Sequence, residues 1–139
     1  MISCTRRLTF CAGHRVKGHE SKCAHLHGHN YVVWITAEAA LDSIGRIIDF
    51  SVLKATMGEW LEKEWDHGFV LFNEDQEAIA AVNSMKTQKL YLMPTNPTAE
   101  NMAQYLLTSI APQLLAGTGV IITKVVIGET ENCSAEATT

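Results

Sequence analysis

Alternating apolar and polar residues at both ends of the chain predict antiparallel strands. Residues 2–12 and 29–40 carry β-favouring residues, and the stretch between them reads as a long polar connection. The apolar run 120–128 is the strongest strand signal, and a short strand over 133–138 is expected to pair with it. Four strands in two sequential pairs are therefore expected.

Helical spacing between the strand pairs predicts two long helices. Asp49 is the expected N-cap of a helix over 50–65, and Pro97 and Thr98 open a second helix that Gly117 closes. The residues at helical spacing are Leu53, Met57, Trp60, Leu61 and Glu64 in the first helix, and Ala103, Leu106, Leu107, Ile110 and Leu114 in the second.

The segment 73–93 gives a mixed signal. We expect a short helix near 75–84 and an extended piece near 88–93. The order of two strands, helices and two strands predicts an α+β fold, a four-stranded antiparallel sheet with two long helices on one face.

Composition is that of an ordinary globular protein, and we expect one domain over residues 1–139. Hydrophobic residues make up 47% and charged residues 19%, and the net charge of −4 argues against nucleic acid as a partner. The N-terminus lacks a signal-peptide pattern, and no apolar run is long enough to span a membrane. We therefore expect a cytoplasmic protein whose four cysteines are reduced, without a Cys4–Cys133 bridge.

Histidines are concentrated between residues 14 and 30, which hold five of the six. His27 and His29 would point to the same side of a strand, and His14 on the neighbouring strand would complete a three-histidine site. Three protein ligands with an open fourth position are typical of catalytic zinc. From the residues alone, His25 or His19 could replace His14, and adventitious binding by a histidine-rich loop is the alternative.

Two further groups could move protons. Cys23 is four residues before His27 and is either a fourth zinc ligand or a free thiol that acts as a base. Asp66 and His67 follow the first helix and form either a simple helix-end pair or a proton shuttle oriented by the carboxylate.

Charged residues suggest how a substrate would be bound. Glu129 ends the strongest strand and is either solvated or a bidentate acceptor for the N–H edge of a guanine or pterin ring, with Glu131 on the same face as the fallback. A positive cluster beside the proposed metal would suit a phosphorylated substrate; its members are Arg15, Lys17 and Lys22.

Taken together, these motifs resemble the 6-pyruvoyl- and 6-carboxy-tetrahydropterin synthase family over about residues 6–133. The blocks that carry the resemblance are A-G-H-R at 12–15, C-A-H-L-H-G-H-N at 23–30, I-I-D-F at 47–50, W-D-H at 65–67, N-P-T-A-E-N at 96–101 and G-E-T at 128–130. The chain departs from shorter family members in the 28 residues between His67 and Asn96.

The resemblance implies the tunnelling fold, in which subunits form trimers with a continuous barrel and two trimers stack into a hexamer with active sites between subunits. It implies a pterin substrate and a zinc ion, and it assigns roles to matching positions. The zinc ligands would be His14, His27 and His29; the catalytic base would be Cys23, working with Asp66 and His67; Glu129 would anchor the pterin, with Thr98 and Glu100 as neighbours in the pocket.

The spacing within the motif bears on the reaction. Three residues separate Cys23 from His27, which resembles the 6-carboxy branch, whereas the pyruvoyl branch typically has five. The 6-carboxy reaction converts 7,8-dihydroneopterin triphosphate into 6-carboxy-5,6,7,8-tetrahydropterin, acetaldehyde and triphosphate, for queuosine and other 7-deazapurines. The stretch E-S-K-C-A-H-L-H-G-H, which contains Glu20, also resembles a folate-directed subgroup that forms 6-hydroxymethyl-7,8-dihydropterin; the alternative is that Glu20 is only a solvated loop residue. A pterin-binding module without turnover is the non-enzyme alternative.

Overall fold

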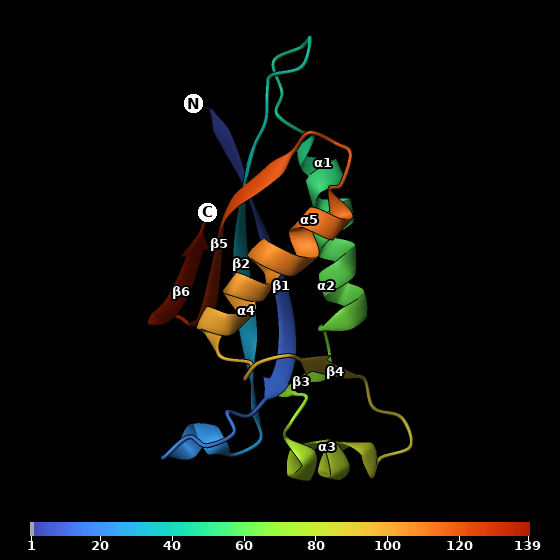
Figure 1. Ribbon diagram of the computed structural model, residues 1–139, viewed down its shortest axis with the longest axis vertical. Coiled ribbons are helices and arrows are strands. Elements are labelled where there is room, and N and C mark those ends of the chain that lie inside the picture. Colours follow the sequence, from blue (N-terminus) through green and yellow to red (C-terminus); the bar gives the residue numbers. More distant parts are fainter. Residues whose placement is uncertain (1) are drawn as a thin grey trace.

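The computed structural model describes residues 2–139, and its centre is a single curled sheet (Figure 1). The strands lie in the order β4-β3-β1-β2-β5-β6. Their bounds are β1 Ser3–His14, β2 His27–Glu38, β3 Gly68–Phe72, β4 Leu90–Met93, β5 Ile121–Thr130 and β6 Cys133–Thr138. The α+β class and the four predicted strands are confirmed.

The prediction of a four-stranded antiparallel sheet is wrong, because the sheet has six strands and is mixed. The additional strands β3 and β4 run parallel to β1 and to each other. Both lie in the 28-residue segment where the chain departs from shorter family members, and β4 contains most of the extended piece expected near 88–93. The run that forms β3, Gly-Phe-Val-Leu-Phe, does not alternate, because strands in parallel pairing are commonly buried on both faces.

The first long helix follows its predicted bounds closely. It comprises α1 (Phe50–Leu53), a π-helical stretch over Lys54–Gly58, and α2 (Glu59–Glu64). The side chain of Asp49 accepts a hydrogen bond from the Ser51 amide, as expected of an N-cap.

The second long helix has the same construction. It comprises α4 (Ala99–Tyr105), a π-helical stretch over Leu106–Ile110, and α5 (Ala111–Leu114), and Thr98 caps its N-terminus. Both long helices cover the same face of the sheet (Figure 1), while α3 (Gln76–Asn83) packs on β3 at the end where β1 finishes.

The main core lies between these helices and the sheet. Most of the helix positions predicted to face it are buried, and they pack against the strand residues of alternate parity. Of these predicted positions, the buried ones are Leu53, Met57, Leu61, Ala103, Leu106, Leu107 and Ile110, and the half-buried ones are Trp60, Glu64 and Leu114. Within residues 2–139, no helix is long and apolar enough to cross a membrane, and all four cysteines are free.

Strand boundaries differ from the predicted ones where the site lies. β1 continues through His14, and β2 begins at His27, so the connection between them spans 15–26 and contains a short 3-10 turn at Lys22–Ala24. β5 runs on to Thr130, which places Glu129 inside the strand.

Candidate metal centre and proton-transfer pair

Three histidine rings gather where β1 ends and β2 begins. The antiparallel register sets His14 opposite His27 and places His29 opposite Ala12, two positions further along. The ring centroids of the three histidines are 4.5 to 5.1 Å apart, and one nitrogen from each ring lies within 4.8 Å of the others. This is the three-histidine cluster that the strand pattern predicted.

Main-chain carbonyls orient two of these rings. Nδ1 of His14 donates to the Pro97 carbonyl at 2.7 Å, and Nδ1 of His27 donates to the His25 carbonyl at 2.7 Å. A carbonyl oxygen only accepts, so each neutral ring carries its proton on Nδ1 and presents a bare Nε2. The two Nε2 atoms are 3.1 Å apart. Two lone pairs at that distance repel each other unless a cation lies between them.

The third histidine is also short of a partner. Nε2 of His29 is buried and makes no hydrogen bond within residues 2–139, although Oε1 of Glu129 lies 3.3 Å away. A buried polar atom without a partner is costly, and coordination to a metal would satisfy it. The donor set therefore fits a zinc ion held by three imidazoles, each with its second nitrogen free to be oriented by the protein.

Burial favours the neutral, metal-binding form of His14 and His29. It lowers the pKa of His14 to about 4, against the hydrogen bond to Pro97, and the neighbouring His27 and His29 lower it further. Burial also lowers the pKa of His29, while the Glu129 carboxylate opposes the shift. Neutral imidazole is the form that ligates a metal.

Asp66 and His67 form a pair fixed to β1. The Asp66 carboxylate accepts from the Cys11 amide at 2.9 Å and from Nδ1 of His67 at 2.8 Å, and the His67 amide donates to the Cys11 carbonyl at 2.7 Å. Burial alone would raise the pKa of Asp66, but these hydrogen bonds outweigh it and hold that pKa below its ordinary value. His67 adopts a left-handed φ of 62°, and its imidazole is 79% exposed. The carboxylate orients a ring that is free to exchange protons with an outside group.

A match to known sequences covers almost the whole chain. The family model described as 6-pyruvoyl tetrahydropterin synthase matches residues 3–139. The chain belongs to this family. Two relatives, both named 6-carboxy-5,6,7,8-tetrahydropterin synthase, are from Rickettsia felis and Rickettsia typhi; they are 41% and 42% identical to this chain, each over 98% of it and 99% of the relative.

Solved structures agree on the architecture. An uncharacterized protein from Wolinella succinogenes superposes with a TM-score of 0.82 at 21% identity, covering 99% of this chain and 98% of the other. The 6-pyruvoyl tetrahydropterin synthase of Caenorhabditis elegans gives a TM-score of 0.73 at 22% identity, covering 99% and 95%. At this level of identity the likeness establishes a shared fold.

The remaining predicted residues lie outside the histidine cluster. Cys23 lies half-buried in the 3-10 turn, and its thiol joins neither the histidine cluster nor the Asp66–His67 pair. Glu20 is 89% exposed on the same connection. Thr98 and Glu100 lie at the N-terminus of α4, where Thr98 is occupied as the helix cap.

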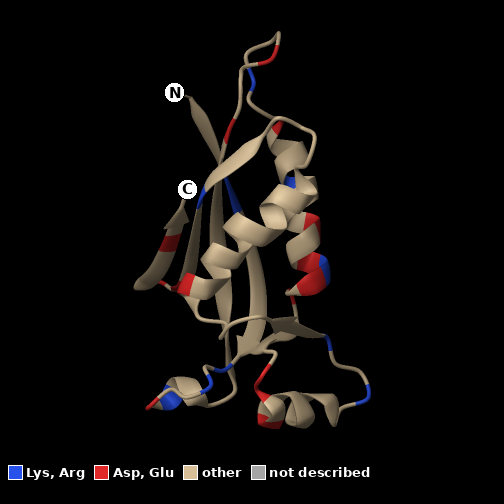
Figure 2. Ribbon diagram, viewed as in Figure 1, with Lys and Arg blue, Asp and Glu red and all other residues tan. Residues whose placement is uncertain are grey.

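Part of the positive cluster is neutralised within the fold. Figure 2 shows basic positions along the 15–26 connection. The Arg15 guanidinium, however, donates two hydrogen bonds of 2.7 and 2.6 Å to Asp75, which is 1% exposed. Nζ of Lys17 donates to the Glu74 carbonyl, whereas Lys22 makes no side-chain hydrogen bond or ion pair within residues 2–139.

Two contributors to the site were not predicted from the sequence. Asn96 clamps the main chain of Lys17, accepting from its amide at 2.8 Å and donating to its carbonyl at 3.1 Å, directly beside the Pro97 carbonyl that orients His14. Cys11 holds the Asp66–His67 pair through its main chain. The N-P-T-A-E-N block contained Asn96, but nothing in the sequence pointed to its partner.

Proposed function

We propose that this chain is a zinc-dependent 6-carboxy-5,6,7,8-tetrahydropterin synthase, a lyase that acts on 7,8-dihydroneopterin triphosphate. The observation that carries the proposal is the near-full-length similarity, at 41–42% identity, to two relatives of that name. The oriented three-histidine cluster supports it, since the reaction requires a metal with an open position. The product would serve queuosine and other 7-deazapurine synthesis.

Each group has a role that its surroundings support. His14, His27 and His29 would hold zinc, which when bound supplies the Lewis acidity that lowers the pKa of the substrate's side-chain hydroxyls. Glu129 would accept two hydrogen bonds from the N–H edge of the pterin, with Thr98 and Glu100 as neighbours in the pocket. Lys22 would attract the triphosphate.

Proton transfer would use Cys23 and His67 on either side of the substrate. Cys23 would remove a proton from a side-chain carbon as a thiolate, and His67 would return one, with Asp66 holding its Nδ1. Because Cys23 and the pair do not meet within one chain, we infer that two chains complete each site.

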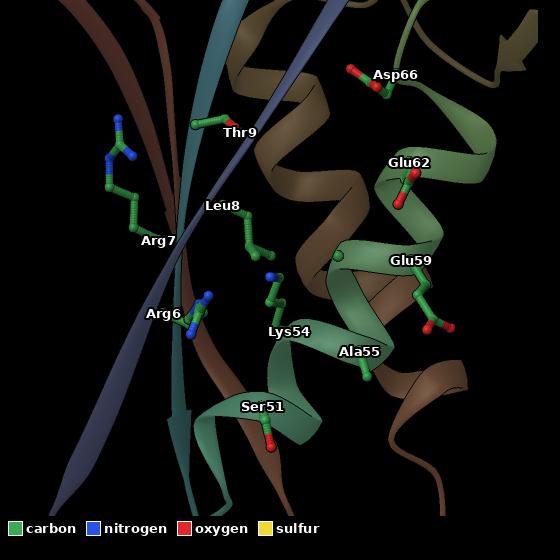
Figure 3. Close-up of a pocket in the computed structure, with 11 residues that line it drawn as sticks. Arg6, Arg7, Leu8, Thr9, Ser51, Lys54, Ala55, Glu59, Glu62 and Asp66 are labelled. Atoms are coloured by element: carbon green, nitrogen blue, oxygen red, sulfur yellow. The ribbon is translucent and has the colours of Figure 1, made fainter.

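The edges of the sheet support an assembly of this kind. Beyond its short pairing with β3 at Ala12–His14, β1 has no strand on its outer edge within residues 2–139, and β6 pairs only with β5. A groove of about 540 Å³ follows that edge of β1, between the strand and α1–α2. Figure 3 shows Arg6 and Leu8 of the strand across from Lys54 and Glu62 of the helices. An unpaired strand edge can form a sheet with a strand of another chain. We expect β6 of a second copy to pair there, so that the chains form trimers that stack into a hexamer.

The decisive experiment identifies the product that zinc-loaded protein forms from 7,8-dihydroneopterin triphosphate by mass spectrometry. The proposal expects 6-carboxy-tetrahydropterin together with acetaldehyde. A 6-hydroxymethyl-dihydropterin or 6-pyruvoyl-tetrahydropterin product would overturn the assignment, and no turnover would leave a pterin-binding module. The His29→Ala variant is the metal-free control.

Variants test the shared site directly. Cys23→Ala should lose turnover and keep zinc, whereas loss of zinc would make Cys23 a ligand. When Cys23→Ala and His67→Ala chains are unfolded, mixed and refolded together, about a quarter of the sites regain both groups if two chains complete each site. No recovery of activity would place both groups on one chain.

The strand edge has its own pair of variants. Thr9→Pro removes an N–H that faces the open edge, and Thr9→Val keeps it. The proline variant should give smaller particles by light scattering with zinc still bound, and unchanged particle size would exclude pairing at this edge.

A further inference from the structure

A second group of metal-binding atoms lies on the opposite face of the sheet from the histidine cluster. The thiol of Cys11, the carboxylate of Asp66 and a ring nitrogen of His67 all lie within 4.8 Å of one another. Cys11 and His14 are three residues apart on β1, so their side chains point to opposite faces. The two groups of donors are therefore separate.

The main chain preorganises this second group. The Cys11 amide donates to the Asp66 carboxylate at 2.9 Å, and the His67 amide donates to the Cys11 carbonyl at 2.7 Å. These bonds tie residues 55 positions apart in the sequence to one point on β1. They also hold His67 at its positive φ, which turns the imidazole beside its neighbour's carboxylate. The three donors are thus close together before any ion arrives.

The donors are reachable from solvent. Cys11 and His67 both line a surface hollow of about 390 Å³, and Asp66 lies at the edge of the neighbouring groove along β1. Figure 3 shows the Asp66 carboxylate at the end of that groove, directed toward the strand. A hydrated cation can therefore approach through the hollow beside Cys11 and His67, whose lining shares no residue with the groove where the strand of a second copy is expected.

We propose that Cys11, Asp66 and His67 form a second, weaker cation site that takes zinc or a similar thiophilic divalent ion. Thiolate, imidazole and carboxylate are the ligands that zinc prefers, and water would fill the fourth position. On binding, the bond to the metal replaces the thiol proton of Cys11, which is released to solvent. His67 binds through its unprotonated Nε2, or through Nδ1 once the Nδ1 proton has moved to Nε2. The site is weaker than the histidine cluster because its imidazole is 79% exposed.

Occupancy of this site would inhibit the enzyme. The second ion would occupy the carboxylate and imidazole that the proposed function uses for proton transfer. The inhibition therefore rests on the proposed function, whereas the binding of the second ion does not. Excess zinc is then expected to suppress turnover. Because the Cys11 thiol has no part in the proposed reaction, loss of this inhibition in a Cys11 variant would assign it to the second site.

Cobalt titration separates the two sites without any assay of turnover. Three imidazoles give no sulfur-to-metal charge-transfer absorption, whereas a site with a thiolate does. We expect the first equivalent of Co²⁺ to give only the weak visible bands of a nitrogen-ligated ion, and the second to add near-ultraviolet thiolate absorption. Cys11→Ser should remove that absorption and the second equivalent, while Cys133→Ser, the matched control at an exposed cysteine of β6, should keep both.

Several results would overturn the inference. Binding of a single equivalent, or thiolate absorption that persists in Cys11→Ser and vanishes in Cys23→Ser, would show that the second site does not exist. Inhibition of turnover by excess Zn²⁺ that is equal in the wild type and in Cys11→Ser would remove its regulatory consequence. Failure of the proposed function would instead appear as absent turnover with the cobalt titration unchanged.

Discussion

Replacing Asn96 with alanine should loosen the metal centre without touching a metal ligand. The Asn96 amide makes two hydrogen bonds to the main chain of Lys17, of 2.8 and 3.1 Å. The Asn96 carbonyl separately accepts from the Asn101 side chain, a bond that the alanine variant keeps. The substitution therefore removes the hydrogen bonds that join the 15–26 connection to Asn96. The next residue, Pro97, carries the carbonyl that orients His14.

The magnitude follows from the bonds that are lost. Two hydrogen bonds of ordinary geometry contribute about 1–3 kcal/mol together, and we take the lower half of that range because both are at the surface. Removing a group that orients a metal-bound histidine typically lowers metal affinity about 10–100-fold. Asn96 does not contact a histidine itself but holds the segment beside the Pro97 carbonyl, so we take the lower end of that range. We expect zinc affinity to fall about tenfold, equivalent to about 1.4 kcal/mol.

Competition with a chromophoric chelator at neutral pH measures the affinity, and urea unfolding of the metal-free proteins measures stability. Asn83→Ala is the matched control, since its amide is exposed at the end of α3 and makes no side-chain hydrogen bond within residues 2–139. Zinc affinity of Asn96→Ala equal to that of Asn83→Ala would refute the reasoning, even if the variant were less stable.

Three further substitutions test the packing around the site. Arg15→Leu leaves the buried Asp75 carboxylate unpaired and should cost about 3 kcal/mol in urea unfolding at neutral pH. Arg15 lowers the pKa of Asp75 in the folded state, so the pair's contribution to stability is complete above the carboxyl's ordinary pKa of 3.8 and is lost as the pH falls below it. The variant should therefore lose less stability in acid than the wild type does, and equal acid profiles would contradict this. Gly28→Ala would put a Cβ 2.9 Å from the Ala12 carbonyl and should part the two strands beside the metal ligands. Zinc affinity should then fall at least tenfold in the chelator assay, and unchanged affinity would show that the strands tolerate the contact. Asp49→Ala removes an N-cap and should lower stability by about 1 kcal/mol in thermal unfolding, with zinc affinity unchanged.

Local patterns predicted the elements that face the core and the cluster at their end. The parity of His27 and His29, and the antiparallel pairing that sets His14 opposite His27, follow from alternation in neighbouring strands. The N-cap at Asp49 and the start of the second helix at Thr98 follow from side chains that satisfy free amides.

Contacts between distant segments could not be predicted in this way. β3 and β4 pair in parallel across long connections, and their short apolar runs resemble any buried segment. The Pro97 carbonyl lies 83 residues from His14, and a carbonyl carries no side-chain signal. Cys11 was not predicted because its main-chain amide and carbonyl, which hold Asp66 and His67, carry no signal in the sequence.

Under the proposed function, the arrangement of the groups would link assembly to catalysis. The three proposed metal ligands belong to two strands of one chain, so a single chain would suffice to hold the proposed zinc ion. The Asp66–His67 pair instead lies on the outer edge of β1, at the end of a stretch that lacks a partner strand within residues 2–139. The predicted base, Cys23, is not beside this pair. A strand that closed this edge would come from a second chain and would bring that chain's residues to Asp66 and His67. Under the proposed function, metal binding is then a property of the subunit and turnover a property of the assembly, because the open edge and the incomplete site are the same part of the molecule.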